Sequence, residues 1–507
     1  MLLFILSGLA LGFGALFPES YLCFSLFLLS AFIFRLALAK TKRILLGAFI
    51  SGVIFHAIAF YWLCNTVQVF GGLSPFLGFL VMLLFCVTGA PQFILAAFFF
   101  KRLERNSFLG SLILPSAWLI ADFLSPRLFP WEIGHGLIIL KQIAGLAEYV
   151  GVPLLSFLFV WWGSVLAESF LNKRFGSLVK CIGFTLVFVF IGACRNSIVI
   201  SEIKKSPALK VGLIQGNLSL EVKGKQAYFA ANLNKYLELS KKVAVDLLIW
   251  PESVSSKWMP EEVSNLSELG MNFNLNTPLI FGGLAYAPRD SAEIQALINN
   301  FPELATKQFV DSFSFKKYNA AIGIDAAGNV LGRYYKKVLM PFGEYIPYSD
   351  HFPWIRLSLP MIADFSPGDK DKPIELGEQI KAGTLICYED LVPSLSREAV
   401  NQGANLLVNL TNDAWYGETP ASHQHHLLAL WRAIETRRYF LRSTNTGYTA
   451  IVSPFGESIK PLATFTEDFL VSDVHLLQSK SIYSQLGDLP AQLLVVVLGL
   501  LCFRKSA

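Results

Sequence analysis

Charged residues are scarce in this chain. Asp, Glu, Lys and Arg together make up 16% of its 507 residues, whereas 53% of the residues are hydrophobic. A soluble protein of this length carries more charge, so the composition excludes a purely soluble protein and predicts one that enters a membrane. Motifs of three common enzyme classes are also missing: the sequence contains no G-x-S-x-G elbow, no Walker loop and no G-x-G-x-x-G fingerprint.

Cysteine is nearly absent from the polar part of the chain. Six of the seven cysteines fall in or beside long apolar runs, where a thiol behaves as a small hydrophobic group: Cys23, Cys64, Cys86, Cys181, Cys194 and Cys502. Only Cys387 lies outside such a run. It has no disulfide partner within its own domain, and a lone thiol there favours a chemical role.

The long apolar runs predict about eight transmembrane helices. A helix needs about 20 apolar residues to cross the bilayer core. The first and last runs are shorter than this but can still span a bilayer. The runs are Leu2–Phe17, Tyr21–Leu38, Ile44–Cys64, Pro75–Phe100, Phe108–Leu124, Val150–Ala167, Ser177–Cys194 and Leu489–Phe503. The chain thus divides into a seven-helix region at 1–200, a globular domain at 207–487 and a C-terminal transmembrane helix at 488–507.

Basic residues in the short connections predict the orientation in the membrane. They gather after the second, fourth, sixth and last runs, as the positive-inside rule requires of cytoplasmic segments: Arg35, Lys40, Lys42, Arg43, Lys101, Arg102, Arg105, Lys173, Arg174, Arg504 and Lys505. We therefore expect both termini on the cytoplasmic side and the globular domain on the far side of the membrane, which in a bacterium is the periplasm or outer face. The net charge of +5 reflects this bias, and no basic groove with interleaved aromatic residues predicts nucleic-acid binding.

The globular domain alternates short apolar strands with amphipathic helices. Strands are predicted at residues 211–216, 246–251, 279–282, 318–325, 330–336, 381–388, 405–410, 448–453 and 469–474, and helices at 226–243, 391–401 and 423–444. A turn at Ala327-Gly328-Asn329 joins two of the strands into a hairpin. Hairpins mixed with βα units predict a layered α/β or α+β domain with a mixed sheet.

Three chemically active side chains lie at the ends of predicted strands. Glu252 follows the strand at 246–251, Lys336 closes the hairpin, and Cys387 closes the strand at 381–388. Strand ends on one edge of an open sheet converge, so a carboxylate, an ammonium group and a thiol could share one cleft. A single Glu, Lys or Cys at such a position is more often solvated or packed than catalytic. The flanking sequences of these three residues favour the catalytic interpretation.

The flanking sequences resemble the Glu, Lys and Cys motifs of the nitrilase superfamily. They are Trp250-Pro251-Glu252-Ser253, Tyr335-Lys336-Lys337 followed by Pro341-Phe342-Gly343-Glu344-Tyr345, and Ile386-Cys387-Tyr388-Glu389. With further matching segments at 409–417, 424–425, 432–435 and 442–447, they are similar to the membrane-bound branch of that superfamily, the apolipoprotein N-acyltransferases. The resemblance implies a polytopic α-helical membrane protein with an inserted α/β nitrilase-like αββα sandwich.

Each member of this Glu-Lys-Cys triad has a distinct expected role. A thiol with a pKa of about 8.5 is mostly protonated at neutral pH, so it needs a base or a cation. Glu252 is the candidate base that takes the proton as Cys387 attacks an ester carbonyl. Lys336 would hold the thiolate and, with a backbone N–H near Tyr388, would stabilise the tetrahedral oxyanion.

Two supporting carboxylates have alternative roles. Glu344 could orient Lys336 or relay protons, and Glu389 could line the pocket or make a purely structural hydrogen bond. Lys337 is the rival lysine, but in a strand its side chain points away from that of Lys336, and the spacing to Glu344 favours Lys336.

Other polar residues offer competing interpretations. The three histidines in the segment 423–426 could suggest zinc, but no cysteine or carboxylate follows at a metal-ligand spacing, so neither a metal nor an organic cofactor is expected. A dyad of Cys387 and His425, of the protease type, remains an alternative. His56 and Asp122 lie within apolar runs and could be functional, or could pair with a neighbouring helix or lie near an interface.

The expected reaction is a two-step acyl transfer through a Cys387 thioester. The membrane region would deliver a lipid ester, and the apolar strip at 352–362 could act as a lid or wedge. The resemblance implies a membrane phospholipid as acyl donor and the N-terminal α-amine of a diacylglyceryl-cysteine apolipoprotein as acceptor, and we expect a monomer. Two alternatives remain open: a membrane-tethered amidase or nitrilase that hydrolyses a C–N bond, and a transporter or sensor that binds a ligand without chemistry.

The sequence departs from the family pattern at two places. Residues 288–314 form a longer polar segment than usual, and Met340 stands where valine is more typical. Neither change touches the triad, but the longer segment could alter the access of lipid or acceptor.

Overall fold

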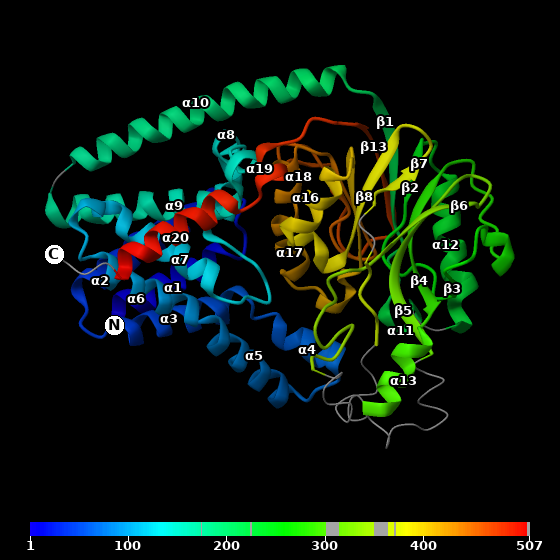
Figure 1. Cartoon of the computed structure of the whole chain (residues 1–507), viewed down its shortest axis with the longest axis horizontal. Coiled ribbons are helices and arrows are strands. Elements are labelled where there is room, and N and C mark those ends of the chain that lie inside the picture. The colour runs from blue at the N-terminus through cyan, green and yellow to red at the C-terminus, as the bar shows by residue number, and fades with distance from the viewer. Residues whose placement is uncertain (174, 224–225, 301–313, 349–363, 370–371, 504–507) are drawn as a thin grey trace.

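The computed structural model describes residues 1–173, 175–223, 226–300, 314–348, 364–369 and 372–503. Figure 1 shows two parts, with apolar helices on one side and a β-sandwich flanked by helices on the other. The long helix α10 (Gly176–Lys205) leads from the helical part to the first strand of the sandwich, and α20 (Leu489–Phe503) returns to it. The first and last helices, α1 (Leu2–Gly14) and α20, therefore both lie in the helical part (Figure 1).

Helices occupy each of the eight predicted transmembrane runs. Within the described ranges, four are long and apolar enough to cross a membrane: α2 (Tyr21–Lys40), the consecutive pair α5 (Pro75–Gly89) and α6 (Pro91–Leu103), α9 (Ala147–Asn172), and α10. The helices α3 (Ile44–Ala59) and α4 (Leu63–Gly71) form a pair bent by 55°. Three apolar helices are shorter than a full span: α1 (Leu2–Gly14), α7 (Ile113–Leu124) and α20. Short helices complete this part: η1 (Ser107–Leu112), η2 (Ile133–Ile139) and α8 (Lys141–Ala144).

Glycines let the membrane helices approach one another closely. A Cβ added at Gly8 of α1 would lie 2.6 Å from the carbonyl oxygen of Ser51 in α3, and one added at Gly47 would overlap the ring of Phe4. Lipid tails are as apolar as the helices, so close packing of this kind, rather than the hydrophobic effect, holds helices together in a membrane.

The sandwich consists of two sheets. The first has the strand order β13-β1-β2-β4-β5-β6, with β3 beside β4, and the second has the order β12-β11-β10-β9-β8-β7. The strands are β1 (Ala208–Gln215), β2 (Leu247–Ile249), β3 (Trp258–Pro260), β4 (Leu279–Pro288), β5 (Phe315–Ile324), β6 (Val330–Tyr335), β7 (Ile374–Leu376), β8 (Ile380–Ile386), β9 (Leu406–Thr411), β10 (Phe440–Thr444), β11 (Ala450–Val452), β12 (Ser458–Ile459) and β13 (Asp468–His475). The predicted hairpin is the antiparallel pair β5–β6.

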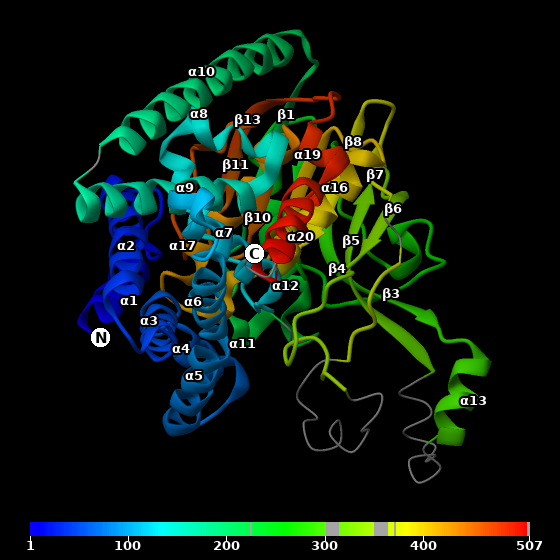
Figure 2. The same cartoon turned by 60° about the vertical axis from the view of Figure 1, so that its left-hand side comes forward.

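Helices cover the outer face of each sheet, which gives the expected αββα order. Leu239 of α12 packs with Leu248 and Trp250 on the first sheet, and Ala399 of α16 packs in one cluster with Leu407 of the second. The helices of this part are α11 (Leu220–Lys223), η3 (Gln226–Tyr228), α12 (Phe229–Lys241), η4 (Leu266–Leu269), α13 (Ser291–Asn300), η6 (Cys387–Leu391), α16 (Pro393–Asn401), η7 (Asp413–Tyr416), α17 (Ala421–Ala429), α18 (Trp431–Thr436) and α19 (Ile482–Leu486). Figure 2 shows α13 projecting from the sandwich on the side away from the membrane helices.

The helix predicted at 423–444 was wrong in its last third. The helical segment ends at Thr436 because Arg437 adopts a left-handed conformation, with φ of 51°, and the chain then forms strand β10. Every residue of β10 is buried, so its sequence shows no alternation of polar and apolar residues. A strand that is buried on both faces lacks this alternation, so periodicity does not distinguish it from a continuation of the preceding helix.

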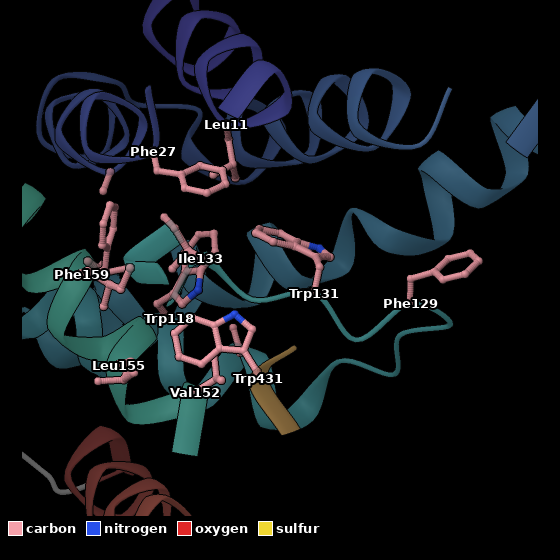
Figure 3. Packing of buried hydrophobic residues seen from close by; sticks show 14 of the residues in the cluster. Leu11, Phe27, Trp118, Phe129, Trp131, Ile133, Val152, Leu155, Phe159 and Trp431 are labelled. Atoms are coloured by element: carbon pink, nitrogen blue, oxygen red, sulfur yellow. The ribbon is translucent and has the colours of Figure 1, made fainter. Parts of the chain in front are cut away.

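The helices that cover the second sheet pack directly against the membrane helices. Trp431 of α18 is fully buried, and Figure 3 shows it beside Trp118 and Val152 of the helical part. Gln424 of α17 accepts a hydrogen bond from Trp62 Nε1 (2.7 Å) and donates to carbonyl oxygens at the ends of α1 and α3. These contacts fix the sandwich relative to the membrane part.

Candidate active site

Glu252 lies in a tight turn after β2. The backbone of Gly282 in β4 bonds to both sides of this turn, with Gly282 N–H donating to the carbonyl of Pro251 over 3.1 Å and Val254 N–H donating to the carbonyl of Gly282 over 2.9 Å. A Cβ at Gly282 would lie 2.5 Å from Cα of Glu252, so this close approach requires glycine. The side chain of Glu252 is buried, at 7% exposure.

Lys336 follows β6 and forms a buried ion pair with Glu344. Its Nζ lies 2.7 Å from Oε2 of Glu344, which also accepts the backbone N–H of Met340 over 2.9 Å. Burial lowers the pKa of Lys336, but Glu344, Cys387 and Glu252 outweigh burial and hold it above its ordinary value. The lysine therefore remains a fixed positive charge.

Asn319 joins the two carboxylates and was not predicted from the sequence. Its Nδ2 donates to Oε1 of Glu252 over 2.7 Å and to Oε1 of Glu344 over 2.9 Å. Asn319 is 3% exposed and stands in the apolar stretch of β5. A polar residue within such a strand was the available signal, because a buried amide requires hydrogen-bond partners.

Cys387 lies at a sharp turn between β8 and η6. It has φ of 51°, an uncommon conformation for a residue with a side chain, and its carbonyl accepts a hydrogen bond from Asn409 Nδ2 over 3.1 Å. Cys387 as a whole residue is partly buried. The first backbone N–H groups of a helical turn have no partner within that turn, so those after Cys387 are available to an oxyanion.

The electrostatic surroundings of Cys387 keep its thiol protonated at rest. Burial, followed by the charge of Glu252, raises the pKa of the thiol, whereas Lys336 and Thr411 lower it, and the net shift is upward. Glu252 and Lys336 are therefore both close enough to act on the sulfur electrostatically. The thiol needs a base at the moment of attack, and Glu252 can serve as that base.

Glu389 joins two segments of the site: the residues that follow Lys336, and the turn that contains Cys387. Its carboxylate accepts the backbone N–H groups of Lys337 (2.6 Å), Val338 (3.0 Å) and Ile386 (2.8 Å), together with the hydroxyl of Tyr334 (3.0 Å). Burial raises its pKa to about 7. All four contacts are to groups of the protein itself, which fits the structural one of the two roles expected for Glu389.

Tyr388 connects the cysteine turn to the membrane part. Its hydroxyl donates to the carbonyl oxygen of Leu128, and its ring lies 6.4 Å from that of Phe129. Burial raises the pKa of Tyr388 to about 12. The rival lysine, Lys337, points elsewhere, since its Nζ pairs with Glu398 at 3.0 Å.

A buried cluster of charges supports the turn from behind. His425 Nε2 lies 2.7 Å from Asp390 and its Nδ1 lies 3.0 Å from Asp413, while Arg442 bonds to both aspartates. Burial and Arg442 lower the pKa of His425, but the two aspartates outweigh them and raise it to about 9. Both ring nitrogens face carboxylates, an arrangement that does not support the dyad of Cys387 and His425.

Several other predicted residues lie away from this site. His56 bonds through Nδ1 to the carbonyl of Gly52 within its own helix, and Asp122 contacts Gln92 and Arg127. The strip at 352–362, expected as a lid, lies outside the described residues. The longer segment begins with the end of β4 and with α13, and its residues 301–313 also lie outside the described part. Among the residues that the structure describes, no group of three His, Cys, Asp or Glu side chains could hold a metal ion.

The geometry supports covalent catalysis by a thiol. The thiol of Cys387, the carboxylate of Glu252 and the ammonium group of Lys336 act on one another electrostatically, and Tyr388, the residue after the thiol, contacts the membrane part. This combination suits acyl transfer, in which a thiol attacks a carbonyl carbon and positive groups stabilise the oxyanion.

Comparisons with known proteins agree with this arrangement. Residues 210–482 match the carbon-nitrogen hydrolase family, and residues 7–165 match the N-terminal domain of apolipoprotein N-acyltransferase. Proteins with that name from Geobacter metallireducens and Azotobacter vinelandii are each 29% identical, over 90% and 98% of this chain and 87% and 95% of their own. Nit3 of Saccharomyces cerevisiae, from the nitrilase superfamily, is similar over 57% of this chain and 96% of its own, with 18% identity and a TM-score of 0.37. The chain therefore belongs to the carbon-nitrogen hydrolase family, in the membrane-bound branch whose members are named apolipoprotein N-acyltransferases.

Proposed function

We propose that the protein transfers a fatty acyl chain from a membrane phospholipid to the N-terminal α-amine of a diacylglyceryl-cysteine apolipoprotein. The observation that carries this proposal is the position of the thiol: Lys336 and Glu252 act on Cys387 electrostatically, and the next residue, Tyr388, bonds to the membrane part at Leu128. A thiol at this junction is accessible to a lipid ester, and the names of the relatives point to the same activity.

The first step forms a thioester. Glu252 takes the proton of the Cys387 thiol while the sulfur attacks the ester carbonyl of the phospholipid. Lys336 and the backbone N–H of Tyr388 stabilise the resulting oxyanion. The ester C–O bond then breaks, Glu252 returns the proton to the leaving oxygen, and lysophospholipid departs.

The second step transfers the acyl chain to nitrogen. The α-amine attacks the thioester carbonyl, the C–S bond breaks, and Glu252 takes a proton from the nitrogen that becomes the amide. The proton returns to the sulfur and restores the resting thiol. Throughout both steps Glu344 holds Lys336, and Asn319 holds the carboxylates of Glu252 and Glu344.

We place the protein in the bacterial inner membrane with both termini cytoplasmic and the sandwich periplasmic, acting as a monomer. Apolar helices and the relatives support a bacterial membrane protein, and the basic connections support the orientation. Fluorescent and alkaline-phosphatase fusions at the C-terminus test the orientation, because only the fluorescent fusion is expected to be active.

An N-acylation assay tests the function. Purified protein, phospholipid and a synthetic diacylglyceryl-cysteine peptide are incubated, and N-acylated peptide is measured by mass spectrometry. We expect the Cys387→Ser variant to be inactive and the Cys194→Ser variant, which alters an exposed thiol, to be fully active. Full activity of Cys387→Ser would refute the mechanism. Release of free fatty acid without N-acylated peptide would instead indicate a hydrolase.

A further inference from the structure

A separate cavity of about 180 Å³, lined by charged and apolar side chains, lies between the membrane helices and the sandwich. Its lining comes from α7, the loop after it, η2 and α9 on the membrane side, and from η6, α16, α17, α18, α19 and Asp488 on the other. These helices meet between the two parts of the molecule in Figure 1. Arg127, Pro130, Pro393 and Asp488 are partly exposed, so the cavity opens to the surface beside them.

The charged groups that line the cavity have a negative balance. Four carboxylates and two guanidinium groups face it, which gives a formal charge of −2: Asp122, Glu132, Glu435 and Asp488 against Arg127 and Arg432. His135 also lines the cavity, and burial lowers its pKa to about 3, so it adds no charge. Burial raises the pKa of Glu132 to about 8 and that of Glu435 to about 7, so the negative balance develops as the pH rises to 8, and a bound cation would hold both carboxyls in their charged form. An uncompensated negative charge in a partly enclosed site favours a positively charged occupant.

Two of the carboxylates present oxygens that the surrounding protein leaves unpaired. Arg432 Nη2 donates to Oε1 of Glu435 over 3.0 Å, but Oε2 of Glu435 has no hydrogen-bond partner among the described residues. The same holds for Oδ2 of Asp122, whose other oxygen accepts from Gln92. Glu435 is fully buried and Asp122 is 4% exposed. A buried acceptor without a donor costs free energy, so these oxygens require an occupant that donates hydrogen bonds.

The size of the cavity and the need of its unpaired oxygens for hydrogen-bond donors indicate the class of occupant. The acidic side chains of the described residues do not converge as metal ligands do, and the space exceeds that of a bare ion. A primary ammonium group brings one positive charge and three N–H donors, which match several separated carboxylate oxygens. We propose that this cavity binds a small primary ammonium ion, either a free amine such as ethanolammonium or the ethanolamine headgroup of a phospholipid.

An occupant would also affect the candidate active site. Arg127 and Glu132 line the cavity, while Leu128 and Phe129 of the same loop contact Tyr388 beside the nucleophile. The cavity therefore shares one loop with the cysteine turn. The inference itself does not rest on the proposed acyl transfer, because binding can be measured without turnover.

Thermal unfolding of the full-length protein in lipid-free detergent tests the proposal. Ethanolammonium chloride is titrated at pH 8 against choline chloride at equal ionic strength, because choline carries the same charge without N–H donors. We expect ethanolammonium alone to raise the unfolding temperature saturably, by about 2 °C. Equal effects of the two salts would overturn the proposal.

Variants locate the site. The Glu435→Gln and Asp488→Asn substitutions remove one negative charge each, and Asp488→Asn alters a partly exposed residue, so it is expected to fold even where Glu435→Gln does not. We expect both to lose the ethanolammonium effect, whereas Glu467→Gln, on the exposed surface, retains it. An undiminished effect in Asp488→Asn and in any folded Glu435→Gln protein would refute the site.

Lipid-containing micelles distinguish the two sources of the ammonium group. Diether phosphatidylethanolamine and diether phosphatidylglycerol are compared, because ether lipids cannot donate an acyl chain. Greater stabilisation by phosphatidylethanolamine in the unaltered protein, but not in Asp488→Asn, assigns the cavity to the headgroup. An effect of free ethanolammonium alone assigns it to a soluble amine, and no effect of either contradicts the proposal.

Discussion

Asn319 Nδ2 donates a hydrogen bond to Oε1 of Glu252 over 2.7 Å. The same amide group bonds to Glu344, which in turn holds Lys336. The proposed base and the proposed cation are therefore linked through one buried side chain, which fixes the orientation of the base.

Replacing Asn319 with leucine should slow thioester formation. The substitution keeps the volume but leaves Glu252 and Glu344 each without one donor, and a hydrogen bond to a charged group contributes about 1.5–3 kcal/mol. We expect the rate of acylation of Cys387, followed by mass spectrometry, to fall about tenfold to hundredfold. The exposed Asn299→Leu serves as control. An unchanged rate in Asn319→Leu would remove Asn319 from the mechanism.

Glu252, Lys336 and Cys387 could be singled out from the sequence because each closes a strand within a distinctive motif, and their catalytic roles stay a prediction. The contacts around these residues could not, because they depend on which strands pair within a sheet and on how one sheet packs against the other. Asn319 lies opposite Glu252 only after β4 and β5 pair, and Glu389 reaches the lysine segment across the two sheets. Likewise, β10 was predicted as helix because its burial on both faces removes the alternation that identifies a strand.

The buried pair of His425 with two aspartates predicts a specific pH dependence. The pKa of His425 is about 9 in the folded protein and about 6.5 when unfolded. A raised pKa stabilises the folded state fully below about pH 6.5, and this contribution is lost as the pH rises through 9. The unfolding temperature should therefore fall more steeply between pH 6.5 and 9 in the unaltered protein than in His425→Gln. Identical slopes for the two proteins would show that the pair does not titrate in this way.

The ion pair of Arg437 and Glu148 should hold the sandwich to the membrane part. Arg437 Nε lies 3.0 Å from Glu148 Oε2, both side chains are 1% exposed, and Arg195 also bonds to Glu148. Arg437→Met removes one partner of a buried pair, so we expect a loss of about 3 kcal/mol in stability, measured by thermal unfolding. The double variant Glu148→Gln/Arg437→Met should recover part of this loss.

A matched control separates this effect from a general loss of surface charge. Lys235 pairs with Glu467 at 2.9 Å on the exposed surface, where such pairs contribute about 0–1 kcal/mol. Lys235→Met should therefore change the unfolding temperature little. If Arg437→Met behaved like Lys235→Met, the buried pair would have no role in joining the two parts.

The most direct test of the central claim is the intact mass of the protein after exposure to phospholipid without acceptor. The account predicts one added acyl group, mapped to Cys387 by peptide analysis and removed when a diacylglyceryl-cysteine peptide is supplied. It also predicts slower acylation in Glu252→Gln and none in Cys387→Ser. An absent adduct, or an adduct that persists in Cys387→Ser, would contradict the account.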